Sequence, residues 1–177
     1  MNLYVRWVGR LNEWVGRVAG LLVVAVVLII VREVVGRGAF NAPSVWADES
    51  MTYLAGMAYA LGGGFALLYR KHVTVDIVSE RIARRGGWPK QVVCTAAFLV
   101  FALYCLTLVW FGWDLAWNSI RQHEGSGTLW NPPLWPVKLA IPAAGLLLLL
   151  QGFANLLVDL GLARPRGPDA KEGGDGR

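Results

Sequence analysis

Four long apolar runs dominate the pattern of hydrophobic and polar positions along the chain. They cover residues 18–35, 46–69, 92–113 and 139–162. A helix needs about 20 apolar residues, each rising about 1.5 Å, to cross the hydrocarbon core of a bilayer. Each run is close to that length, so the pattern predicts an all-α integral membrane protein with four transmembrane helices.

The segment before the first run is amphipathic at the helical period. A polar stripe follows one face through Arg6, Arg10, Glu13 and Arg17, and apolar side chains cover the other faces. This pattern predicts an N-terminal helix that lies in the inner membrane interface before the chain turns into the bilayer. Such a helix anchors the chain in lipid or docks a partner, and the sequence leaves both open.

The polar segments after the second and fourth runs differ in kind. Residues 70–85 are amphipathic, with Glu80 one turn before Arg84, and predict a short helix along the cytoplasmic surface. Residues 163–177 consist mainly of proline, glycine and charged residues, which predicts a disordered cytoplasmic tail. The chain therefore divides into a four-helix membrane domain, residues 1–162, and this tail.

Basic residues are distributed unequally between the two sides of these spans. The first segment, the connection between the second and third runs, and the tail hold most of the 17 lysines and arginines. The opposite side holds Arg32, Arg37, Arg121 and Lys138. Because short cytoplasmic loops are enriched in Lys and Arg, this asymmetry places both termini and the middle connection in the cytoplasm.

Composition agrees with a membrane protein. The chain is 55% hydrophobic and 16% charged, which is more apolar surface than a soluble domain of 177 residues needs. Its pI near 9.6 does not indicate a nucleic-acid partner, because the basic residues flank the apolar runs and act there as orientation signals.

The sequence lacks the constellations expected of an enzyme or a metal site. Cys94 and Cys105 lie in one run, roughly 16 Å apart along a helix. His72 and His123 fall on opposite sides of the membrane in this topology. No Asp, Glu, Lys or Arg lies at the centre of a run, where a proton-coupled transporter needs a carboxylate. We expect no catalysis, no cofactor and no independent movement of a substrate.

Polar and small residues within the runs predict helix packing. Gly56, Ala60 and Gly64 recur every fourth residue, which lets another helix approach closely. Gln151 lies at mid-depth in the fourth run and needs a hydrogen-bonding partner on another helix.

The start of the second run carries helix-capping signals. Ser44 is expected to cap this helix, and Asp48 and Glu49 then fall in its first turn, where the helix dipole favours acids. A polar contact of these acids with a neighbouring subunit is the alternative interpretation.

Two stretches carry a resemblance to a known family. They contain Arg32, Asn41-Ala-Pro43, Trp46, Glu49, Gly62 and His72-Val-Thr-Val-Asp76, then Pro133-Leu-Trp-Pro-Val-Lys138, Ile141-Pro142 and the Leu-rich run to Gln151. In their order, their spacing and the four-span frame, they resemble the small membrane subunit of tripartite ATP-independent periplasmic (TRAP) transporters, the DctQ-like small permease. The resemblance covers most of residues 20–160.

This resemblance implies a function. In the family, a periplasmic binding protein captures an organic acid, and a large permease subunit moves it across the bacterial inner membrane with a sodium gradient. The small subunit packs beside the large one and holds it in place, while the substrate and sodium sites belong to the large subunit. The chain would then form a heterodimer with the large permease, meet the binding protein transiently, and carry no cofactor.

The resemblance also marks positions for structural or interface roles. These are Arg32, Glu49, Gly62, His72, Asp76, Pro136, Lys138 and Pro142. The alternative is a membrane scaffold or assembly factor unrelated to transport, because such a protein shares the four spans and the amphipathic segments.

Overall fold

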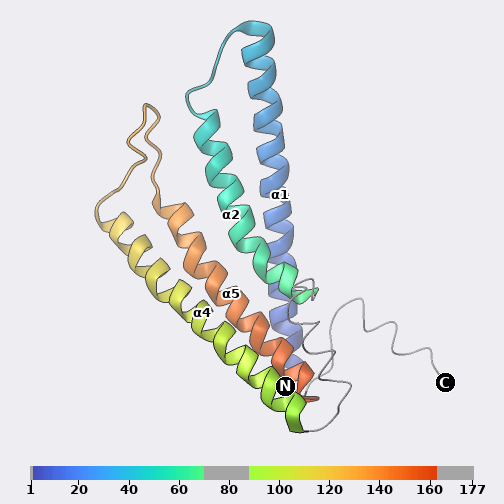
Figure 1. Ribbon diagram of the computed structural model, residues 1–177. Helices are drawn as coiled ribbons and strands as arrows, with labels where there is room; N and C mark the ends of the chain where they lie inside the picture. The colour runs from blue at the N-terminus through green and yellow to red at the C-terminus, as the bar shows by residue number, and fades with distance from the viewer. Residues whose placement is uncertain (1, 70–87, 163–177) are drawn as a thin grey trace, which may run out of the picture.

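The computed structural model describes residues 2–69 and 88–162, and in these ranges the chain forms helices and no β-strand (Figure 1). The helices are α1 (Asn2–Phe40), α2 (Ala47–Leu68), α4 (Trp88–Arg121) and α5 (Trp135–Asp159). Each contains a stretch long and apolar enough to cross a membrane. The predicted all-α membrane protein with four spanning helices is confirmed.

α5 is the central helix of the bundle. It packs against α4 and α2, and it also contacts α1, whose first turns lie beside the C-terminal part of α5 (Figure 1). Among the described helices, α4 contacts α5 alone. Accordingly, 39% of the most apolar stretch of α5 is buried within the chain, against 6% for α4.

We call the helix ends that carry the loops 41–46 and 122–134 the outer ends, and the opposite ends the inner ends.

α1 differs in form from the predicted N-terminal helix. Residues 2–17 are the first turns of one helix that continues through the predicted span, rather than a separate element. Val5 and Val8 of these turns are buried together with Ala154 of α5. This packing explains the continuation, because a turn into the bilayer at residue 17 would pull both valines off α5. That these turns lie at the membrane interface remains a prediction.

The outer ends of α4 and α5 extend past the predicted spans. α4 continues to Arg121, and two residues later His123 adopts a left-handed φ of 47°, which turns the chain out of the helix. α5 begins at Trp135 with Pro136 in its first turn. Proline is well suited to this position, because the N–H groups of the first turn have no acceptor within the helix. The connecting loop is therefore 122–134.

α4 and α5 approach closely where glycines face the partner helix. A Cβ atom at Gly145 would lie 3.2 Å from the carbonyl oxygen of Cys105, and one at Gly112 would lie 2.9 Å from Cδ of Pro142. Pro142 itself is buried inside α5, which continues as a helix beyond it. The proline ring thus fills the space left by the glycine of α4.

Some predictions concern residues outside the described ranges. The amphipathic helix expected at 70–85 and the tail 163–177 are among them. His72 and Asp76, both marked by the family resemblance, lie there as well.

Candidate partner-binding surface

Glu33 of α1 is the centre of a polar cluster at the outer ends of α1 and α2. Its carboxylate accepts hydrogen bonds from Nε of Arg37 at 2.6 Å and from the backbone N–H of Ser44 at 3.0 Å. Nη2 of Arg37 also donates to Asp48 at 3.0 Å. One buried acid and one arginine therefore join α1, the 41–46 loop and the first turn of α2.

Arg32 extends this cluster to the side. It donates to Glu33 at 3.3 Å, and its guanidinium lies 5.1 Å from the ring centroid of Trp46. Ser44 was expected to cap the second helix, and this was wrong: the capping position is Trp46, with no side-chain hydrogen bond. The backbone of Ser44 is bound to Glu33 instead, while the two acids expected in the first turn of the helix are there.

A second set of contacts joins the 122–134 loop to α2 and α5. Ser126 of the loop donates to Glu49 of α2 at 3.2 Å. Glu124 of the loop forms an ion pair with Lys138 of α5. Glu49 and Lys138 thus contact the same loop from two helices. Their positions agree with a structural role, although contact with a partner protein remains a prediction.

The Glu124–Lys138 pair predicts a pH-dependent stability. The hydrogen bond from the Lys138 ammonium holds the pKa of Glu124 below its ordinary value. The folded chain therefore binds fewer protons here than the unfolded chain, so the contribution is present above the ordinary pKa and is lost as the pH falls below it. Melting temperatures of the wild-type chain and Glu124→Gln in detergent should differ at about pH 7 and converge towards about pH 3. A difference that is the same at both pH values would contradict this.

At the inner ends, three amide side chains, two of them buried and one half-buried, form a hydrogen-bonded network. Nδ2 of Asn12 donates to Oε1 of Gln151 at 3.0 Å, and Nε2 of Gln151 donates to Asn155 at 3.0 Å. Nδ2 of Asn155 then donates to the carbonyl oxygen of Leu67 at 3.1 Å. This inner amide network connects α1, α5 and α2, and it supplies the interhelical partner that Gln151 was predicted to need.

Asn12 was missed by the sequence reasoning. The signal was available, because Asn12 lies on a different face of α1 from the stripe of Arg6, Arg10 and Arg17. The structure buries it completely, and its Oδ1 atom has no hydrogen-bond donor within the described residues. A polar residue on the apolar face of an amphipathic helix should be assigned a partner on another helix.

The small residues of α2 divide between two environments. Gly64 is buried, and a Cβ atom there would lie 2.2 Å from Oδ1 of Asn12. Ala60 is half-buried, whereas Gly56 is exposed and a Cβ atom at Gly56 or at Gly62 would meet nothing within 4 Å. The close approach at Gly64 is therefore made within the chain. Contact of the Gly56 end with a partner remains a prediction.

α4 presents a long exposed apolar face. Trp113 and Trp117 lie on it with their rings stacked at 6.4 Å, and Arg121 lies over Trp117 at 5.1 Å. Further exposed side chains on α4 include Leu99, Val100, Leu103, Leu106, Trp110 and Phe111. In a membrane protein such a face meets lipid or another helix.

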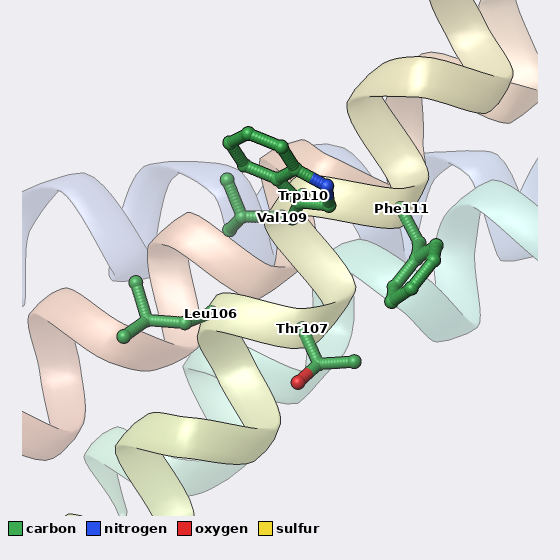
Figure 2. A pocket seen from close by; sticks show the side chains of 5 residues that line it. All are labelled: Leu106, Thr107, Val109, Trp110 and Phe111. Carbon is green, nitrogen blue, oxygen red and sulfur yellow. The ribbon is translucent and has the colours of Figure 1, made fainter.

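The depression on α4 is part of this face rather than a ligand pocket. Figure 2 shows the lining side chains Leu106, Thr107, Val109, Trp110 and Phe111, all from α4. Among the described residues, no second helix forms an opposite wall, and the Thr107 hydroxyl donates within α4 to the carbonyl oxygen of Leu103. Within residues 2–69 and 88–162, no group of three His, Cys, Asp or Glu side chains could hold a metal ion.

These features define a multi-pass membrane protein in which polar side chains hold the helices together, while large apolar faces stay uncovered by the part of the chain that the structure describes. The chain belongs to the family of the DctQ component of tripartite ATP-independent periplasmic transporters, whose model matches residues 26–161. That range covers α1 from residue 26 to its end at Phe40, and all of α2, α4 and α5. The family inferred from the sequence is confirmed.

A known relative agrees with this assignment. The chain is similar to the sialic acid TRAP transporter permease protein SiaT of Haemophilus influenzae (strain 86-028NP), with 27% identity over 106 residues. The similar region covers 56% of this chain and 17% of that much longer permease. The match thus relates this chain to one part of a transport protein.

Proposed function

We propose that this chain is the small membrane subunit of a sodium-coupled TRAP transporter for organic acids. It packs beside the large permease subunit and holds it in the bacterial inner membrane, with both termini in the cytoplasm. A periplasmic binding protein delivers the substrate, and the substrate and sodium sites belong to the large subunit. The observation that carries this proposal is the family match over residues 26–161.

The polar contacts of the chain support a scaffolding role. In the outer cluster around Glu33 and in the inner amide network, polar side chains bind other groups of the same chain. They fix the positions of helices, and neither forms an open site for a solute. A rigid set of helices is what a supporting subunit needs.

The position of α4 supports docking on a larger protein. α4 contacts α5 alone among the described helices and leaves an aromatic face exposed. Aromatic side chains are enriched in the buried centres of protein interfaces. The large permease is the partner that family membership provides for such a face.

The test is sodium-dependent uptake with and without this chain. The large permease and the binding protein are expressed in a host that lacks them, either alone or together with this chain, and uptake of a labelled organic acid is measured. We expect uptake, and the amount of large permease in the membrane, to require this chain. Equal uptake and equal permease levels in its absence would refute the proposal.

A further inference from the structure

One face of the first turns of α1 combines tryptophan and arginine in alternation. Trp7, Arg10, Trp14 and Arg17 follow each other at steps of three and four residues, which places them on one side of a helix. All four are exposed, and the two tryptophans are 61% and 65% exposed. We call these residues the Trp–Arg face.

The packing of α1 on α5 sets the depth of this face in the membrane. On the opposite side of the same turns, Val5 and Val8 are buried with Ala154 of α5, and Tyr4 donates to the carbonyl oxygen of Leu150 at 3.1 Å. Both α5 residues lie within its candidate membrane span, Trp135–Val158. The first turns of α1 therefore lie beside the end of a candidate spanning helix, where we expect the bilayer boundary.

Contact with α2 places Arg17 slightly deeper. The neighbouring Gly16 lies against Phe65, because a Cβ atom there would be 2.8 Å from Cβ of that side chain. Phe65 precedes the end of α2 at Leu68 by about one turn. Arg17 thus faces outwards about one turn inside the inner end of α2, where an arginine needs an anion or must extend its side chain to the headgroup layer.

The charges of this face are not neutralised by the described part of the chain. Arg10 and Arg17 form no hydrogen bond or ion pair with residues 2–69 and 88–162. Glu13, the nearest acid on α1, already has an interaction of its own, as has Arg6. Two guanidinium groups therefore face the surroundings at headgroup depth.

We propose that the Trp–Arg face binds the headgroup phosphates of acidic phospholipids in the leaflet at the inner ends of the helices. Arg10 and Arg17 pair with phosphate oxygens, because guanidinium matches phosphate geometry with two parallel hydrogen bonds. Trp7 and Trp14 lie at the headgroup level, the position that amphipathic indole rings prefer in bilayers. The position of this face beside the end of a spanning helix, with two arginines that have no acidic partner in the described part of the chain, favours a lipid headgroup layer as its occupant.

Native mass spectrometry on the full chain, purified in mild detergent with the subunits that accompany it, tests this inference. Phosphatidylglycerol and phosphatidylcholine are added at equal concentration, and the bound lipids are counted. We expect the wild-type chain to prefer phosphatidylglycerol. Arg10→Gln with Arg17→Gln should reduce that preference by about fivefold for each arginine, since a basic residue near an anionic surface contributes about 1 kcal/mol.

Two control variants separate a specific site from general charge. Arg121→Gln removes an exposed arginine that lies over Trp117 at the outer end of α4, and it should leave the lipid preference unchanged. Arg10→Lys with Arg17→Lys keeps the charge and should retain part of the preference. All altered side chains are exposed, and unchanged gel-filtration profiles will show that the variants fold.

Three results would overturn the inference. The first is a wild-type chain that binds both lipids equally, and the second is a glutamine variant that keeps the wild-type preference. The third would come from a photo-crosslinking residue placed at position 14. We expect this residue to capture lipid in native membranes. Capture of the large permease instead would show that a protein covers this face. None of these results depends on whether the chain supports transport.

Discussion

Gly64→Leu should disrupt the packing of α1 on α2 and α5 and lower the stability of the chain by about 1–3 kcal/mol, the usual cost of overfilling a packed site. A Cβ atom at position 64 would lie 2.2 Å from Oδ1 of Asn12 and 3.3 Å from Cβ of Leu147. α1 or α5 must therefore move to admit a leucine. The melting temperature in detergent, followed by fluorescence-detected gel filtration, should fall clearly.

Gly62→Leu is the matched control. Position 62 lies on the same helix, half a turn away, and a Cβ atom there would meet nothing within 4 Å. The two substitutions have the same chemistry and the same helix propensity, so they differ only in what the new side chain meets. We expect Gly62→Leu to melt close to the wild-type temperature. Equal destabilisation by both variants would contradict the packing at Gly64.

This pair also separates internal packing from partner binding. A substitution at Gly64 tests how the chain packs on itself, because the position faces Asn12 and Leu147. A substitution at Gly56 tests the outside of α2, because that residue is exposed. The regular spacing of small residues in the sequence predicted close packing, but spacing alone does not say which of them turns inwards.

The membrane spans were predictable because the bilayer imposes its own simple requirement. Every spanning helix must present about 20 apolar residues, and the sequence displays these runs directly. The ends of the helices were less predictable. The first turns of α1 continue the span because Val5 and Val8 pack on α5, and no periodicity within residues 2–17 reports a contact with a helix about 140 residues later.

The outer cluster shows a similar limit. The sequence patterns mark Arg32 and Asp48 as separate features and give Glu33 no role, although Glu33 precedes Arg37 by one helical turn. Its importance comes from the loop, because the backbone N–H of Ser44 binds its carboxylate. That contact requires the chain to turn back on α1, and the pattern of apolar runs does not specify the path of a loop.

Asn12→Leu should destabilise the chain by about 1 kcal/mol, within the range measured for hydrogen bonds between membrane helices. Leucine has nearly the shape of asparagine, so the main loss is the 3.0 Å bond to Gln151. Oε1 of Gln151 then remains buried without this donor. Equilibrium unfolding in mixed micelles should show the loss as an earlier transition with an unchanged slope.

Gln151→Leu completes a double-mutant cycle. It removes the bonds of Gln151 to both Asn12 and Asn155, so its own effect should exceed that of Asn12→Leu. The double variant should be more stable than the sum of the single effects predicts, by about 0.6 kcal/mol and at most about 1.7 kcal/mol. The difference arises because the Asn12–Gln151 bond can be lost only once.

Thr107→Val supplies the additive reference for this cycle. The Thr107 hydroxyl bonds to the carbonyl oxygen of Leu103 on its own helix, and α4 does not contact α1 within the described part of the chain. Combined with Asn12→Leu, it should show effects that add within about 0.5 kcal/mol. If the Asn12–Gln151 pair is equally additive, the amide network does not couple α1 to α5, and the rigidity of the inner ends must come from apolar packing around Val5 and Val8.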